Sequence, residues 1–312
     1  MSNETTAIAD TGVSKKDTSD EPTFAEKFSK IFRGHPAAVA GLIGIVIFVL
    51  LAIFAPLIAP QNPYDQARLD ILDGLLPPMS ELGDGTLSLL GTDALGRDIL
   101  SAVLYGMRIS LLVALIAVIV GSAIGVFMGL LAAMKGGWVE TIIMRTVDLK
   151  MSFPGILLAL MVLAIFGTGI DKVIIALIIC AWASEARLVR AVALSELKKE
   201  YIDSAKLAGL SDFRIMTRFL FPNSISPVLV VLPMSISGAI GAEATLSFLG
   251  VGVPITEPSL GLLIANGNDY ILSGKWWISI FPGLVLVGMV LCINVVADRL
   301  RDHSNPYLRG KD

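Results

Sequence analysis

The sequence predicts an all-α polytopic membrane protein, and three observations support this fold class. Of 312 residues, 54% are hydrophobic and 16% are charged, whereas charged residues make up about a quarter of an ordinary soluble domain. The apolar residues gather in runs that are long enough to cross a bilayer as helices. Lysines and arginines flank these runs and do not cluster on one face with aromatic residues between them, so nucleic acid is not an expected partner.

The apolar runs predict six transmembrane helices. The first run, residues 37–59, begins too late and is too long for a cleaved signal peptide, and as a helix it is roughly 34 Å long, enough to cross a bilayer. Placing the N-terminus inside leaves most lysines and arginines in the cytoplasm, which predicts that both termini are cytoplasmic. The other five spans are expected at about 108–132, 140–166, 172–192, 225–249 and 279–298.

The chain divides into five expected parts. Residues 1–22 are rich in Ser, Thr, Asp and Lys and are expected to be a disordered cytoplasmic tail. Residues 23–35 form an amphipathic pattern, expected to be an interfacial helix on the cytoplasmic leaflet. Residues 36–106 hold the first span and an extracytoplasmic segment, which is too long for a connector and is expected to cover the outer mouth. Residues 107–300 form the transmembrane core, and 301–312 a cytoplasmic tail.

Small residues inside the spans suggest helix packing. Gly121, Gly125 and Gly129 recur at four-residue spacing, which either marks a close helix–helix contact or is incidental. Cys180 and Cys292 both lie in apolar runs and are expected to be unpaired small hydrophobic residues.

Charged residues within the spans need partners, because a charge at a helix centre costs about 2.5–3.5 kcal/mol on insertion scales. Arg145 and Asp148 are three residues apart on one helix face and are expected to form a structural ion pair. Glu185 and Arg187 are two residues apart, so they do not face each other and each needs another partner. Arg190 is close enough to join such a network.

Glu243 is isolated among small residues in the outer half of the fifth span. Two interpretations remain open. It either faces a central pathway or makes a structural hydrogen bond to a neighbouring helix. A proton relay would need a chain of such groups, and no such chain is evident in the sequence.

Enzymatic chemistry finds little support. The histidines, His35 and His303, lie near opposite ends of the chain, so neither a zinc-protease motif nor a Ser-His pair is available within the spans. Gly274-Lys275 lacks the spacing of a phosphate-binding loop, and no Gly-x-Ser-x-Gly elbow occurs. No catalytic site, metal or cofactor of the chain's own is therefore expected.

A polar stretch at 199–223 lies between two apolar spans. It predicts an amphipathic helix to Leu207, a turn at Ala208-Gly209-Leu210, and a second helix with Ser211 as its N-cap. Glycine at 209 permits a sharp reversal and the close approach of another backbone.

This stretch resembles the EAA loop of ABC-importer permeases, the element that docks into the ATP-hydrolysing subunit. The matching residues are Asp203-Ser204-Ala205, Gly209 and Phe221-Pro222, with Asp in place of Glu and Ser in place of Ala.

A second motif, GTDALGRDILSAVLYGMRISL at 91–111, resembles the permeases of dipeptide and oligopeptide importers, specifically the C-type subunit. Within it, Thr92 or Asp93 can cap a helix. Ala297-Asp298-Arg299 departs from the family's more frequent Gly-Asp-Gly. The resemblance covers about 30–310. Further matches are Met144-Arg145, Val147-Asp148, Phe153-Pro154, 246–250, 258–261, Asn294, 300–302 and Pro306.

The resemblance implies the six-helix type I ABC-importer permease architecture in a bacterial inner membrane. It assigns coupling to the ATPase to Asp203, Ser204, Ala205, Gly209 and Pro222. The implied partners are a homologous second permease, one or two ATPase subunits that bind ATP and Mg, and an extracytoplasmic binding protein. That protein would dock on 60–106 and 251–277 and deliver a peptide, and ATP hydrolysis would drive alternating access.

Several alternatives stay open at this point. Permeases of the same pattern import nickel chelates, glutathione, opines or oligosaccharides, and the permease partner could be a second copy of this chain. A secondary transporter would show inverted repeats with broken helices, and no convincing pair is found. A membrane receptor or scaffold would need no pathway. Neither of these two rivals explains the 199–223 loop.

Overall fold

A computed structural model describes Phe32, residues 34–65 and residues 69–304. The predicted tail 1–22, most of the predicted interfacial helix 23–35 and the end of the C-terminal tail, 305–312, lie outside the described residues.

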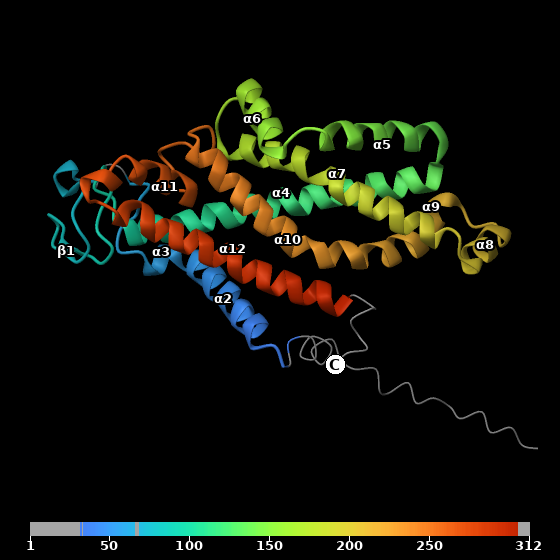
Figure 1. Cartoon of the computed structure of the whole chain (residues 1–312), viewed down its shortest axis with the longest axis horizontal. Helices are drawn as coiled ribbons and strands as arrows, with labels where there is room; N and C mark the ends of the chain where they lie inside the picture. The colour runs from blue at the N-terminus through green and yellow to red at the C-terminus, as the bar shows by residue number, and fades with distance from the viewer. Residues whose placement is uncertain (1–31, 33, 66–68, 305–312) are drawn as a thin grey trace, which may run out of the picture.

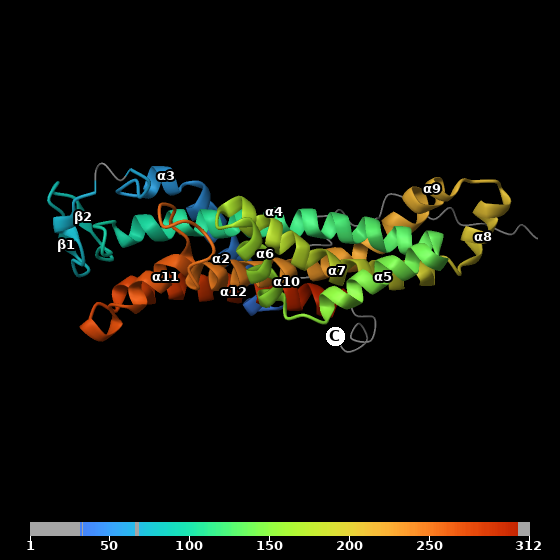
Figure 2. The same cartoon turned by 90° about the horizontal axis from the view of Figure 1, so that it is seen from above.

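Long helices lie side by side along the longest axis of the molecule (Figure 1). Helix α5 runs back beside α7, and the short α6 crosses the direction of the others (Figures 1 and 2). Both views place α11 and the strands at one end and α8 and α9 at the other. The helices are α2 (Pro36–Ile53), α3 (Ala55–Ile58), α4 (Ile99–Lys135), α5 (Gly137–Met151), α6 (Gly155–Phe166), α7 (Ile170–Glu196), α8 (Glu200–Leu207), α9 (Asp212–Ile215), α10 (Phe221–Phe248), α11 (Leu260–Asn268) and α12 (Trp277–Ser304).

Among the described residues, four helical stretches are long and apolar enough to cross a membrane, namely α2, α4, the continuous stretch Asp212–Phe248 and α12. The bent pair α5–α6 makes a fifth if it counts as one span. Helix α7 is long enough, but Glu185, Arg187 and Arg190 lie within it. Six spans and cytoplasmic termini therefore remain predictions.

The predicted third span, 140–166, is not one straight helix. Helices α5 and α6 meet at an angle of 96°. Pro154 lies at the break and has no N–H to donate, and it also disfavours helical backbone at Phe153. The sequence analysis noted the pair Phe153-Pro154 but predicted one continuous span. The bend between α5 and α6 at this pair corrects that prediction.

Helix α4 begins at Ile99, earlier than the predicted core boundary at 107 and the predicted span start at 108. Its N-cap is Asp98, whose carboxylate accepts the Ser101 N–H at 2.7 Å, so the expected cap at Thr92 or Asp93 is wrong. Thr92 and Asp93 instead hold together the segment that precedes α4. The Thr92 hydroxyl accepts the Leu76 N–H at 2.8 Å.

Residues 69–98, part of the predicted extracytoplasmic segment, form a compact cap built around buried polar contacts. It contains the short helix η2 (Ile71–Asp73) and an antiparallel hairpin of β1 (Ser80–Glu81) and β2 (Leu87–Ser88), with Ser80 opposite Ser88. Asp93 pairs with the equally buried Arg97 at 2.7 Å. Arg97 also donates to the carbonyl of Ile255 at 3.3 Å, which ties this cap to the loop that follows α10.

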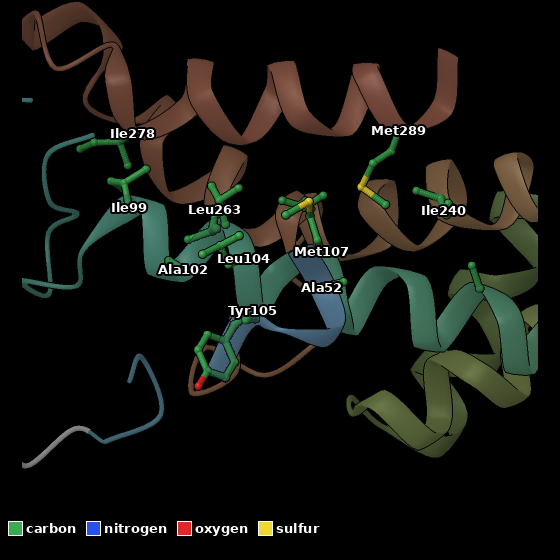
Figure 3. Packing of buried hydrophobic residues seen from close by; sticks show 14 of the residues in the cluster. Ala52, Ile99, Ala102, Leu104, Tyr105, Met107, Ile240, Leu263, Ile278 and Met289 are labelled. Atoms are coloured by element: carbon green, nitrogen blue, oxygen red, sulfur yellow. The ribbon is translucent and has the colours of Figure 1, made fainter. Parts of the chain in front are cut away.

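Helix α4 lies at the centre of the packing. Figure 3 shows its buried residues from Ile99 to Met107 against side chains from α2, α10, α11 and α12. Farther along, the glycine stripe faces α7. A Cβ at Gly125 would lie 2.5 Å from the Trp182 carbonyl oxygen, and one at Gly129 would lie 2.6 Å from that of Ala186. The stripe is therefore a helix–helix face. Both cysteines are free, as expected.

Candidate coupling loop and membrane-embedded charges

Helix α8 is the first half of the predicted coupling loop. Ile202 and Ala205 are buried on one face, three residues apart. Acidic side chains lie in its first turn and Lys206 in its last turn, which suits the helix dipole.

Gly209 ends α8 in a Schellman motif. The Leu210 N–H donates to the Ala205 carbonyl at 3.2 Å, and the Gly209 N–H donates to that of Lys206 at 2.9 Å. Gly209 has a φ of +76°, a left-handed conformation that side chains with a Cβ disfavour. The predicted reversal at Gly209 is confirmed. A Cβ there would meet no described atom within 4 Å, so the space beside it is open.

The second half of the loop returns to the membrane core. Ser211 precedes α9 in extended backbone, but its side chain makes no capping bond. A π-helical turn, η3 (Met216–Leu220), leads into α10. Ile215 and Leu220 are buried with Ile202 and Ala205 against the ends of α4 and α7, so the loop is anchored to both helices.

The five residues assigned to coupling do not all point outward. Asp203, Ser204, Gly209 and Pro222 are exposed, whereas Ala205 is buried at 7% exposure. Ala205 therefore supports the loop from inside and does not offer its side chain to a partner.

Sequence reasoning missed the two most exposed large apolar side chains of the loop. Leu207 is 89% exposed and Phe213 is 70% exposed, one on each side of the turn. In the sequence, both are large apolar residues that do not share the helical spacing of the residues that become buried. Single exposed apolar residues are ordinary, but two on one polar projection favour an interaction surface.

A polar cluster joins the loop to α7, and it too was missed. Lys199 donates to the Glu196 carboxylate at 2.6 Å, and the Tyr201 hydroxyl donates to it at 2.6 Å. These two bonds lower the pKa of Glu196 below its ordinary value. The same carboxylate raises the pKa of Tyr201 to about 12. Asn223 donates to the Tyr201 hydroxyl at 3.3 Å, which links both ends of the loop.

Glu243 does not face an open pathway. Its side chain is fully buried. Ser110 on α4 donates to its carboxylate at 2.6 Å, and Ser247 donates at 2.8 Å. The pathway interpretation is therefore corrected to the alternative, a structural hydrogen bond between helices. The protein tolerates this buried acidic side chain because the two serine hydroxyls donate hydrogen bonds to its oxygens.

The predicted Arg145–Asp148 ion pair is also wrong. Asp148 pairs instead with Arg187 of α7 at 2.5 Å. Because α5 lies beside α7, Arg187 of α7 reaches the Asp148 carboxylate, whereas Arg145 of α5 itself does not pair with it. Arg190 pairs with Glu140, again from α7 to α5.

Glu185 accepts hydrogen bonds from Ser184 at 2.7 Å and from Ser235 of α10 at 3.0 Å. The charges of α7 thus find partners within the protein. Among the described residues, no group of three or more His, Cys, Asp or Glu side chains is placed to hold a metal ion.

Comparison with known proteins places the chain in a family. Residues 124–310 match the family described as "Binding-protein-dependent transport system inner membrane component". Residues 23–78 match the "N-terminal TM domain of oligopeptide transport permease C".

Two curated relatives cover most of the chain. The Di/tripeptide transport system permease protein DppC of Pseudomonas aeruginosa is 38% identical over 93% of this chain and 94% of its own length. The Dipeptide transport system permease protein DppC of Escherichia coli K12 is 40% identical over 91% of this chain and 93% of its own.

Solved structures share the fold. Two inward-facing structures of the MetNI methionine ABC transporter align with TM-scores of 0.50 and 0.51, at 21% and 20% identity. Each alignment covers 65% of this chain and 97% of the other. The likeness confirms the predicted all-α architecture of type I ABC-importer permeases. From the family match and these relatives together, the chain belongs to the inner-membrane components of binding-protein-dependent transport systems.

Proposed function

We propose that this chain is the C-type permease subunit of an ATP-driven importer that carries di- or oligopeptides across the inner membrane. Curated relatives at 38–40% identity are named as dipeptide or di/tripeptide permeases. Those names favour peptides over the nickel chelates, glutathione, opines or oligosaccharides that the sequence left open.

The observation that carries the proposal is the 199–223 loop. It projects at the end of the molecule opposite the β1–β2 hairpin (Figure 1). It exposes Asp203, Leu207 and Phe213 around a turn whose shape depends on Gly209. We assign this surface to a separate ATPase subunit, which would bind ATP and Mg.

The anchoring of the loop supports a coupling role. Ile202, Ile215 and Leu220 pack against the ends of α4 and α7, so a displacement of the loop is passed to those helices. A partner can bias two conformations only if it contacts the loop differently in each. Alternating access would follow from such differential contact, with a second permease completing the pathway and a binding protein docking on the outer segment.

Helix α7 would be the sixth span. Its length, 27 residues, is sufficient. Its charges would be tolerated because Arg187, Arg190 and Glu185 each have a partner within the protein. With α5–α6 as one bent span, the count would reach six, and the loop and both termini would lie in the cytoplasm.

The test compares variants of the loop in the complete complex, which is expressed from its own operon, purified, and reconstituted into lipid vesicles with its binding protein. Gly209→Pro and Gly209→Arg are expected to insert normally but to lose uptake of labelled dialanine. Proline fixes φ near −65° and arginine disfavours the left-handed backbone. Normal uptake by a stably expressed Gly209→Arg protein contradicts the coupling role.

A second pair of variants tests the exposed surface. Leu207→Asp is expected to reduce copurification of the ATPase. Leu272→Asp is the matched control, since Leu272 is 100% exposed in the short helix η4 (Ile271–Ser273), away from the loop. Equal recovery of ATPase from both variants would mean that Leu207 is not part of the interface.

A further inference from the structure

A cavity of 670 Å³ lies at the end of the molecule opposite the coupling loop. It is formed where α10 ends, where α11 packs beside it, and where the α6–α7 connection passes. Its volume falls within the range of pockets that bury a small ligand, about 300–1,000 Å³. Six residues define its character, namely Thr168, Phe248, Ile255, Asn266, Asn268 and Asp269.

Four of the five polar side chains that line this cavity have no partner among the described residues, and the fifth, Ser247, is bonded to Glu243. The hydroxyl of Thr168, the amides of Asn266 and Asn268 and the carboxylate of Asp269 make no hydrogen bond or ion pair with any described residue. Asn266 is partly buried, whereas Thr168, Asn268 and Asp269 are exposed, so these polar groups are open to a ligand that enters from solvent. A concave site that combines apolar side chains with a few polar groups has the usual composition of a ligand pocket.

The electrostatics of the cavity favour a cation. The C-terminal ends of α10 and α11 both adjoin it, and their last carbonyls carry partial negative charge. Asp269 adds a full negative charge, and no lysine or arginine is among the described residues that line the cavity.

Ser247, one of the residues that line the cavity, is held in place by the buried carboxylate of Glu243. Ser247 donates to Glu243 and accepts the Val253 N–H at 3.3 Å, so the loop after α10 is tied to the helix it leaves. Any Cβ at Gly252 would overlap Ser247, and one at Gly261 would overlap the backbone of Ala244. This tight packing fixes the lining before a ligand arrives, which lowers the cost of binding.

Resting on the proposed function, we infer that this cavity receives the protonated amino terminus of an incoming peptide. The ammonium group is attracted by Asp269 and the two helix ends. The amides of Asn266 and Asn268 suit the polar groups of the adjoining peptide bond, and Phe248 and Ile255 offer apolar contact to a side chain. Thus a site on the permease itself selects for a free amino terminus, in addition to any selection by a binding protein.

The test measures direct protection of the cavity in the purified complex without binding protein. Ala265→Cys places a reporter thiol in the lining, in a chain that also carries Cys180→Ser and Cys292→Ser. The rate of labelling by a membrane-impermeant maleimide is measured in the presence of increasing concentrations of dialanine or of N-acetyl-dialanine. Dialanine is expected to slow labelling. Its concentration for half-maximal protection should be at least about tenfold lower than that of the acetylated peptide.

Asp269→Asn in the same chain is expected to remove that difference. Glu81→Gln is the matched control, because Glu81 is an exposed acid of the outer hairpin that does not line the cavity. Equal half-protection by the two peptides, or no protection by dialanine, overturns the inference.

Uptake by the same complex, reconstituted with its binding protein, separates the two proposals. Import of dialanine without any amino-terminal dependence of protection leaves the proposed function standing and refutes the cavity. Failure of the unmodified complex to import any peptide refutes the proposed function itself.

Discussion

Replacing Gly125 by alanine tests whether α4 and α7 need their close contact. Inside a helix, this change ordinarily stabilises by about 0.5–1 kcal/mol, since alanine has less conformational freedom to lose. Here the added methyl group would lie 2.5 Å from the Trp182 carbonyl oxygen and 3.1 Å from the Ala186 nitrogen. Both are backbone atoms of a long helix and cannot rotate away.

The size of the effect follows from these distances. Ordinary contact begins at 3.4 Å, so α7 must retreat by roughly 0.9 Å, the difference between 3.4 and 2.5 Å. A gap of that size forfeits about a quarter to a half of the dispersion energy of the atoms lining it. Overpacking costs about 1–3 kcal/mol, and subtracting the propensity gain leaves a net loss centred on about 1 kcal/mol and at most about 2.5 kcal/mol.

The assay is the temperature at which half of the detergent-purified complex remains monodisperse in size-exclusion chromatography. Gly125→Ala is expected to lower it by about 2–4 °C. Gly238→Ala is the matched control, because a Cβ there meets no described atom within 4 Å. If Gly125→Ala is as stable as the unmodified chain and the Gly238 control, the reasoning about close approach is wrong.

Three further predictions concern single polar contacts. Asp98→Ala removes the cap of α4 and is expected to cost about 1–3 kcal/mol in the same thermal assay, with Asp98→Asn milder because it keeps an acceptor. The Lys199 bond holds the pKa of Glu196 below 4.5, so its stabilisation is present above pH 4.5 and lost as the pH falls further. Hydrogen exchange at 199–203 should then rise, and Glu196→Gln should remove this pH dependence. A double-mutant cycle on the half-buried Arg190–Glu140 pair should give a coupling above the roughly 0.2–1 kcal/mol of exposed pairs.

Equal stability of the Asp98→Ala and Asp98→Asn chains would contradict the first prediction. Hydrogen exchange at 199–203 that does not change with pH in the unmodified chain would contradict the second. A coupling energy near zero between Arg190 and Glu140 would contradict the third.

Features that depend on local pattern could be predicted from the amino-acid sequence. Long apolar runs fixed the membrane class, because a bilayer demands a continuous apolar surface. The reversal at Gly209 was readable because a left-handed residue after a helix is most often glycine. The ordered motifs at 91–111 and 203–222 identified the family.

The contacts of each side chain, in contrast, depend on how the helices pack against one another. Helical spacing placed Arg145 and Asp148 on one face, yet Asp148 pairs with Arg187 because α7 lies against that face. The same limit applied to Glu243, whose serine partner on α4 is 133 residues away in the chain. Periodicity tells which residues share a face of a helix, but only the packing of helices tells what that face contacts. The open cavity beside Asp269 likewise exists because segments distant in sequence converge there.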